Sequence, residues 1–224
     1  MLPHFSIPRM ILSIFINEKR GISVDIRTIF DPDNAVWSFL MKLYSLALAG
    51  LLWFICSLPI ITLGPATIAL FTYCFALLDG RESYLLRTFF STFASSFKQG
   101  IVVTIIVLAA TVFLAFDAWF FLNTIPFLFF AAVALYVLLL FPSLHIFALM
   151  SVQEKTIKEH CTRAFILSIT HIATTITVLV VIVLWFLSIY ALPATIIFSA
   201  GPACIVVSMF LRLLYKRIGA YVIN

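Results

Sequence analysis

Residues 57–70 read SLPIITLGPATIAL and combine strongly apolar side chains with two prolines and a glycine. The composition of the whole chain decides which solvent surrounds these helix breakers. Of the 224 residues, 64% are hydrophobic and 10% are charged, whereas soluble domains are roughly 45–50% apolar and about 25% charged. The mean hydropathy is +1.19. We therefore expect the bilayer to be the solvent and residues 57–70 to contain the turn between two membrane spans.

Six apolar segments flank or follow this turn, and a spanning helix needs about 20 such residues. The predicted fold is an all-α, polytopic transmembrane helical bundle, as a domain over residues 38–217. A cytoplasmic N-terminal segment with an interfacial helix (1–37) precedes it, and a cytoplasmic tail (218–224) follows. The second span is short, and we expect it to continue into the polar segment DGRESYLLRTFFSTFASSFKQ. The expected spans are Leu43–Leu63, Ala66–Leu78, Gly100–Leu122, Ile125–Met150, Ala164–Leu192 and Pro193–Tyr215.

Basic residues gather on one side of this arrangement. The turns near Gly64, Asn123 and Pro193 contain none, and every basic residue lies before the first span, in the other two connections, or at the end of the chain from Arg212 onward. The positive-inside rule then places both termini in the cytoplasm. The net charge of +5 thus reports membrane topology, and with no contiguous basic run we expect no nucleic-acid partner.

The turn itself has a physical explanation in this arrangement. Unpaired backbone amides in lipid cost several kcal/mol each, so Pro59, Gly64 and Pro65 are expected at the outer surface. Pro65 suits the first turn of a new helix, and Gly64 is expected to reverse the chain with positive φ. A similar phrase, LPATIIFSAGPACIVV, occurs at residues 192–207 and indicates a short internal repeat.

Two polar connections are expected to be amphipathic cytoplasmic helices, at 83–98 and 153–163. In the first, Leu86, Phe90, Phe93 and Phe97 recur at helical spacing, with Lys98 following them. Such a stripe contacts either a partner protein or the lipid headgroups. These five residues are the candidate partner contacts.

Ionisable residues within spans are costly and mark function or pairing. Asp117 is expected near the outer interface as a cap or vestibule residue. His145 and His171 are expected at matched depth near the cytoplasmic surface, either as a titrating pair or as hydrogen-bonded residues between helices. The four cysteines form no Cys-x-x-Cys pair, and no nucleophile, phosphate-loop or metal-ligand motif occurs. We predict no catalytic residue, cofactor or metal, and no enzyme.

The stretch CSLPIITLGPATIALFTYCFALLDGRESYLLRTFFSTFASSFKQG resembles the YesL family of bacterial integral membrane proteins, with DPDNAVWSFLMKLYSLALAGLLW as a similar lead-in. The resemblance covers roughly residues 31–100 and assigns no catalytic or binding residue. The matching signature and turn positions are Cys56, Ser57, Leu58, Pro59, Thr62, Gly64 and Pro65, followed by Phe93, Phe97, Lys98 and Gln99.

The resemblance implies a role in complex-carbohydrate uptake, because genes of that family accompany those of carbohydrate ABC importers. We therefore expect a multi-pass cell-membrane protein that acts as an accessory component of such an importer, in contact with membrane lipid. The alternatives are a stand-alone permease, although the loops lack the Glu-Ala-Ala motif of type I import permeases, and a membrane partner of a signalling system. The oligomeric state is left open.

Overall fold

The computed structural model describes residues 35–81, 84–124 and 126–219. The expected interfacial helix at the N-terminus lies outside these ranges, as does most of the tail. The chain divides into two compact units, Met1–Lys42 and Leu43–Asn224. Of the first unit, the structure describes only the beginning of one helix, so the account below concerns the second.

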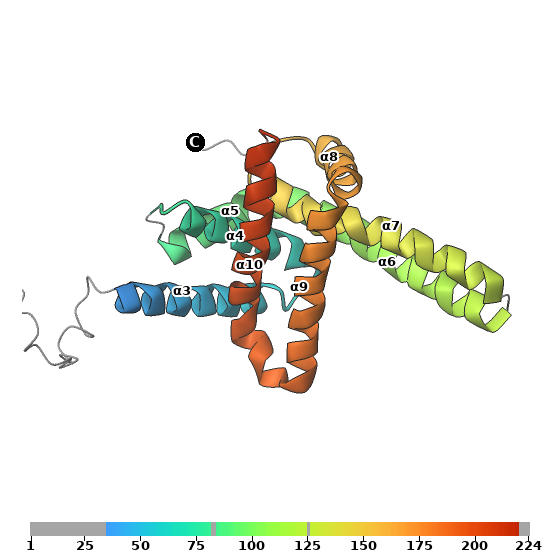
Figure 1. Ribbon diagram of the computed structural model, residues 1–224, viewed down its shortest axis with the longest axis horizontal. Helices are drawn as coiled ribbons and strands as arrows, with labels where there is room; N and C mark the ends of the chain where they lie inside the picture. Colours follow the sequence, from blue (N-terminus) through green and yellow to red (C-terminus); the bar gives the residue numbers. More distant parts are fainter. Residues whose placement is uncertain (1–34, 82–83, 125, 220–224) are drawn as a thin grey trace, which may run out of the picture. The chain divides into compact units, whose positions relative to one another are not determined.

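The described residues form eight α-helices and two 3₁₀ helices, with no strand among them, which confirms the all-α prediction. Six of the α-helices are long and apolar enough to cross a membrane, and Figure 1 follows them along the chain. The elements are α3 (Ala35–Cys56), η1 (Ile60–Thr62), α4 (Leu63–Leu78), α5 (Leu85–Ser95), α6 (Phe97–Thr124), α7 (Pro126–Met150), α8 (Ile157–Thr170), α9 (Ile172–Ala191), η2 (Pro193–Thr195) and α10 (Ile196–Arg217).

The expected fifth span is divided between two helices. α8 ends at Thr170, the backbone of the next residue, His171, leaves the helical region (φ −119°, ψ 51°), and α9 begins directly after it. The span is therefore α9 alone, and the expectation that it begins at Ala164 is wrong. The physical reason is that α8 carries Lys158, Glu159 and Arg163 in its first turns, which favour water over hydrocarbon.

α4 is the most enclosed of the six long helices. It contacts α5, α6, α7 and α10, and 61% of the apolar span Ile60–Leu78 is buried. Its small side chains, among them Ala66, Ala69 and Cys74, are completely buried. Small residues let helix backbones approach closely, and in lipid this close packing drives helix association.

Gly64 has a different role from the one expected. It is the second residue of α4, and the described glycines with positive φ are Gly80 and Gly219. A Cβ on Gly64 would lie 2.6 Å from the Gly100 carbonyl oxygen and would overlap the Thr104 hydroxyl. The prediction of a positive-φ reversal is therefore wrong, because this glycine serves a close approach between α4 and α6. Pro65 does lie in the first turn of α4, as predicted.

The same contact places the turn before α4 beside the first turns of α6, which is not the end of α6 that was expected. Gly100 lies near the beginning of α6, the end that carries Lys98, and η1 also contacts α6. A bundle of six helices of equal depth would instead place this turn beside Asn123, at the other end of α6. The expected position of this turn, at the Asn123 end of α6, is thus wrong, because the paired glycines let α4 cross α6 at its first turns.

The two similar phrases fold alike. Each Leu-Pro is followed by a 3₁₀ helix and then a long helix. The threonine that ends each 3₁₀ helix donates its hydroxyl to the carbonyl three residues earlier, from Thr62 to Pro59 and from Thr195 to Leu192, at 2.7 Å in both. The structural likeness ends there, because Gly64 and Pro65 lie in the first turn of α4 whereas Pro202 lies inside α10.

The α6–α7 hairpin differs from α4 in its surroundings. The two helices pack on each other (Figure 1), but only 11% of α6 and 6% of the α7 span are buried. Large apolar side chains such as Phe113, Phe116 and Phe130 are exposed on them. Hydrocarbon is the solvent that such a surface requires.

Candidate functional site

The carboxyl end of α4 is built around a left-handed glycine. Gly80 has φ +68°, and a Cβ there would meet nothing within 4 Å. The Gly80 N–H donates to the Leu77 carbonyl and the Arg81 N–H donates to the Ala76 carbonyl. These two bonds are those of the Schellman motif, which ends a helix where glycine supplies the left-handed residue. The motif sets Asp79 and Arg81 on either side of the turn.

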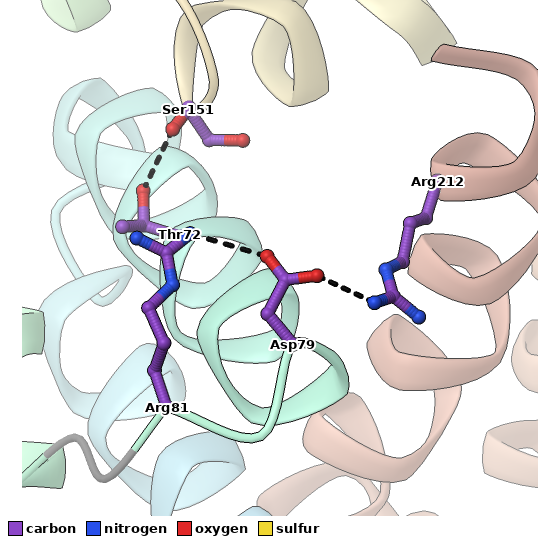
Figure 2. A network of polar contacts seen from close by, with 5 residues as sticks. All are labelled: Thr72, Asp79, Arg81, Ser151 and Arg212. Carbon is purple, nitrogen blue, oxygen red and sulfur yellow. Dashed lines mark hydrogen bonds and ion pairs between the residues drawn. The ribbon is translucent and has the colours of Figure 1, made fainter. Parts of the chain in front are cut away.

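Asp79 joins α4 to α10 through an ion pair (Figure 2). Its Oδ1 lies 2.6 Å from Nη2 of Arg212, and its Oδ2 lies 3.1 Å from Nη2 of Arg81. The Asp79 side chain is only 5% exposed. A carboxylate is unfavourable at a helix C-terminus, where the carbonyl groups carry partial negative charge. The two guanidinium groups offset that cost, so the pairing fixes α10 against the end of α4.

A polar pocket lies between α4, α5, α8 and the connection after α7. Its volume is about 660 Å³. The Thr72 hydroxyl approaches the Ser151 carbonyl oxygen at 3.5 Å on its wall, as Figure 2 shows. Hydroxyl groups line it from Thr72, Thr92, Ser95, Ser96 and Ser151, and longer polar side chains from Gln153, Glu154, Lys155 and Arg163. The pocket thus offers many hydrogen-bonding groups together with two cationic groups and one anionic group.

Arg163 lines one side of the pocket and hydrogen-bonds to the side chain of Gln153. Its Nη1 donates to the Gln153 Oε1 at 2.8 Å. His160, one turn earlier on α8, is 1% exposed and hydrogen-bonds the Gln153 backbone. Burial lowers the pKa of His160, and the nearby charges of Arg163 and Lys155 lower that pKa further, while Glu159 opposes them. The net effect is a lowered pKa, which favours the neutral imidazole.

The two histidines expected as a pair are linked through Thr175, whose hydroxyl lies 2.9 Å from the His145 Nε2 and 3.3 Å from the His171 backbone carbonyl oxygen. His145 on α7 is completely buried, and its Nε2 lies 2.9 Å from the hydroxyl of Thr175 on α9, which is also completely buried. His171 stands at the junction of α8 and α9 and is half-buried. The structure thus gives His145 a helix-joining hydrogen bond. No group of three His, Cys, Asp or Glu residues suited to a metal occurs in the described ranges.

Asp117 lies on α6 about two turns before its end, half-buried and next to the exposed Trp119. It is separate from the polar pocket, which no residue of α6 lines. The expectation of a cap or vestibule residue stays a prediction.

The signature residues form the connection from α3 to α4. The Thr62 hydroxyl donates to the carbonyls of Cys56 and Pro59 at 2.6 and 2.7 Å, which fixes the turn. Ser57 is half-buried and Leu58 is exposed at 66%. These positions therefore shape the backbone, and none of them lines the polar pocket.

The amphipathic helix α5 has two apolar faces. Phe89 is completely buried in the core, and Leu85 and Phe93 pack against it. Leu86 and Phe90 are exposed at 60% and 48%, and Phe97 and Lys98, at the start of α6, are exposed as well. Of the candidate partner contacts, Phe93 thus belongs to the inner face and the other four to the outer surface.

Sequence reasoning missed Phe89, His160 and the pair of Asp79 with Arg212. For Arg212 a signal existed, because a charged residue within an apolar span indicates a buried partner. For the hydroxyl groups of the pocket no signal existed, since isolated serines and threonines occur throughout the chain.

A comparison with protein families finds one match. A family described as "Protein of unknown function, DUF624" matches residues 46–118, which is about a third of the 224-residue chain. That stretch runs from α3 through α4 and α5 into α6. Comparisons with curated proteins and with solved structures give no match. The chain is thus a membrane-type helical protein in which residues 46–118 are similar to a family without an assigned function.

Proposed function

We propose that this chain is a cell-membrane protein that supports uptake of complex carbohydrate by binding another membrane component, such as a subunit of an ABC importer. Two observations support the proposal. The first is the resemblance of residues 31–100 to the YesL family, for which such a role is implied. The second, which carries it, is that α5 is fixed to the core by Phe89 yet leaves Leu86 and Phe90 exposed.

The outer face of α5 has the properties of a docking helix. Leu86 and Phe90 lie four residues apart, one turn of helix, and Tyr84 beside them is exposed at 80%. Apolar residues at this spacing fit a hydrophobic groove on a partner. Because the inner face is already packed, the helix need not fold on binding, which lowers the entropic cost of association.

A stand-alone sugar permease is less well supported. Among the described residues, the cavity between the long helices is lined mainly by apolar side chains, whereas a sugar pathway needs polar groups along its walls. The polar pocket opens beside α8 and the connection after α7, at the ends of the long helices.

The orientation follows from charge. Among the described residues, the basic side chains lie at the beginning of α3, between α4 and α6, from the end of α7 into α8, and in the last turns of α10. We infer that both termini are cytoplasmic. Cysteine labelling from outside the cell tests this: a cysteine at Asn123 is expected to react and one at Lys155 to be protected, and the reverse pattern would refute the orientation.

The partner proposal is tested by affinity purification in mild detergent. The variant Leu86→Asp, Phe90→Asp is compared with wild type and with Phe165→Asp, Ile169→Asp, a matched pair of exposed apolar residues on α8. We expect an importer subunit with wild type and with the α8 variant, and its loss with the α5 variant. If no importer component is recovered with any of them, and deletion leaves growth on oligosaccharides intact, the proposal fails.

A further inference from the structure

A second cavity, separate from the polar pocket, lies between the long helices and opens to their outer surface. Its volume is about 530 Å³, and α4, α6, α7, α9 and α10 contribute walls together with Trp53 of α3. Leucine, valine, alanine and phenylalanine side chains supply most of the lining. Its volume falls within the range of about 300–1,000 Å³ that is typical of ligand sites.

Two tryptophans meet at this cavity, one from the helix that precedes each copy of the repeated phrase. Trp53 and Trp185 pack edge to face with ring centroids 6.0 Å apart. The Trp53 Nε1–H donates to the Thr67 hydroxyl at 3.1 Å, and the Trp185 Nε1–H donates to the Ser199 hydroxyl at 2.9 Å. In both hairpins the donor precedes its acceptor by 14 residues. The repeat thus places two equivalent rings on the wall and binds their polar groups within the protein.

Two of the three hydroxyl side chains on the wall, which are Thr67, Thr111 and Ser143, are also engaged. Thr67 donates to the Leu63 carbonyl at 2.6 Å, and Ser143 donates to the Leu140 carbonyl at 2.6 Å. With these donors and both indole N–H groups satisfied internally, the wall favours an apolar occupant over a sugar or water.

The surroundings and the volume identify the class of occupant. The helices around the cavity are the apolar candidate spans, so hydrocarbon is the medium that reaches it. An apolar cavity of about 150 Å³ holds one benzene ring, so at equal occupancy 530 Å³ takes on the order of 20 carbon atoms. This is the size of one lipid acyl chain.

We propose that the cavity binds one acyl chain of a membrane phospholipid, in contact with Trp53 and Trp185. This site goes beyond the proposed role in carbohydrate uptake and does not depend on it. The chain fills the space between the α6–α7 and α9–α10 hairpins and contributes apolar contacts that neither hairpin makes with the other. Removal of tightly held lipid is therefore expected to lower the thermal stability of the protein.

Tryptophan fluorescence in vesicles tests the site. The variant Trp37→Phe, Trp119→Phe keeps Trp53 and Trp185 as its only tryptophans and is reconstituted in phosphatidylcholine with dibrominated acyl chains, which quench indole on contact. We expect quenching of at least twofold relative to unbrominated lipid. In this background Ala203→Phe, which fills the cavity, is expected to reduce the quenching by about half. The matched control Ala109→Phe, on the exposed face of α6, is expected to leave it unchanged.

Three results would overturn the proposal: equal quenching in the Ala203→Phe and Ala109→Phe variants, little quenching in the two-tryptophan parent, or strong quenching by aqueous acrylamide in place of brominated lipid. A second measurement covers the case in which Ala203→Phe does not fold. Native mass spectrometry of the wild-type protein after detergent washing is expected to show one retained phospholipid per chain. Its absence would also refute the site.

Discussion

α4 and the α6–α7 hairpin respond to the bilayer in opposite ways. α4 follows Pro59 and contains a glycine-proline pair in its first turn, yet 61% of its span is buried. α6 and α7 are long apolar helices, of whose spans only 11% and 6% are buried. In lipid, apolar side chains gain little from burial, so small residues and polar pairs decide which helix is enclosed. Gly64 and Ala69 let neighbouring helices pack closely against α4, and Asp79 pairs it with α10. These contacts stabilise α4 within the bundle, as large apolar side chains stabilise a helix in a soluble core.

The largest expected effect comes from removing the close approach of α4. Gly64→Val places a branched side chain against the Gly100 carbonyl and the Thr104 hydroxyl. We expect it to lower the free energy of unfolding by about 3 kcal/mol, measured by thermal denaturation in detergent. Ala134→Val, on the exposed surface of α7, is the control and is expected to change stability by less than about 0.5 kcal/mol. Equal effects would show that α4 is no more enclosed than the hairpin.

The next effect concerns the ion pair at the end of α4. Asp79→Asn removes the charge that faces Arg212 and Arg81. We expect a loss of about 1–2 kcal/mol, because Arg212 and Arg81 are partly exposed and water takes up part of the cost. Asp117→Asn on α6 serves as the comparison and is expected to be nearly neutral. A larger loss of stability in Asp117→Asn than in Asp79→Asn would contradict this, because the carboxylate on α6 would then contribute more to stability than the ion pair at the end of α4.

Two glycines, one in the first turn of α4 and one just after its end, sharpen the same comparison. Gly64 is needed for close packing, and Gly80 is needed for its left-handed backbone conformation. Gly80 has φ +68° and open space around it, so Gly80→Ala is expected to cost about 1 kcal/mol. Gly80→Asn is expected to cost less, because asparagine tolerates the left-handed region. At Gly64 we expect the opposite order, with asparagine costing more stability than alanine, because asparagine is larger and the contact with α6 leaves little space. The same order at both positions, by thermal denaturation, would contradict this assignment.

The smallest effect is a pH dependence at His160. Its folded pKa is lowered by burial, so the unfolded state binds the proton more readily. The stability is therefore fully present above the ordinary histidine pKa of about 6.5 and is lost as the pH falls from there toward the lower folded pKa. We expect the melting temperature of wild type to fall between pH 7.5 and 5, and to fall less in His160→Gln. Parallel curves for the two proteins would show that another group is responsible.

The sequence predicts where the helices lie along the chain far better than it predicts which helices contact one another. Hydropathy identifies six spans, because each must be apolar over its own length, and Pro65 marks the first turn of α4. Gly64 is misassigned because a glycine needed for a turn and a glycine needed for contact look identical without the partner helix. The fifth span is extended too far because the residues of α8 from Ala164 onward are mostly apolar and merge with α9.

The polar pocket and the docking face are harder to predict than the spans. α5 carries two overlapping apolar stripes, one through Phe89 and one through Phe90, and the periodicity alone selects neither. The pocket is assembled from α4, α5, α8 and a connection, which are far apart in the sequence. α4, α5 and the connections contribute short hydroxyl side chains that carry no local signal, and α8 contributes Arg163.

The most direct test of the contrast between α4 and the hairpin places a single tryptophan in each. In a background with all four tryptophans replaced by phenylalanine, Phe75→Trp on α4 and Phe113→Trp on α6 are reconstituted with dibrominated lipid. Phe75 is 3% exposed and Phe113 is 64% exposed. We predict strong quenching at position 113 and little at position 75. Equal quenching at the two positions, or stronger quenching at 75, would contradict the conclusion that α4 is enclosed by protein while the hairpin faces lipid.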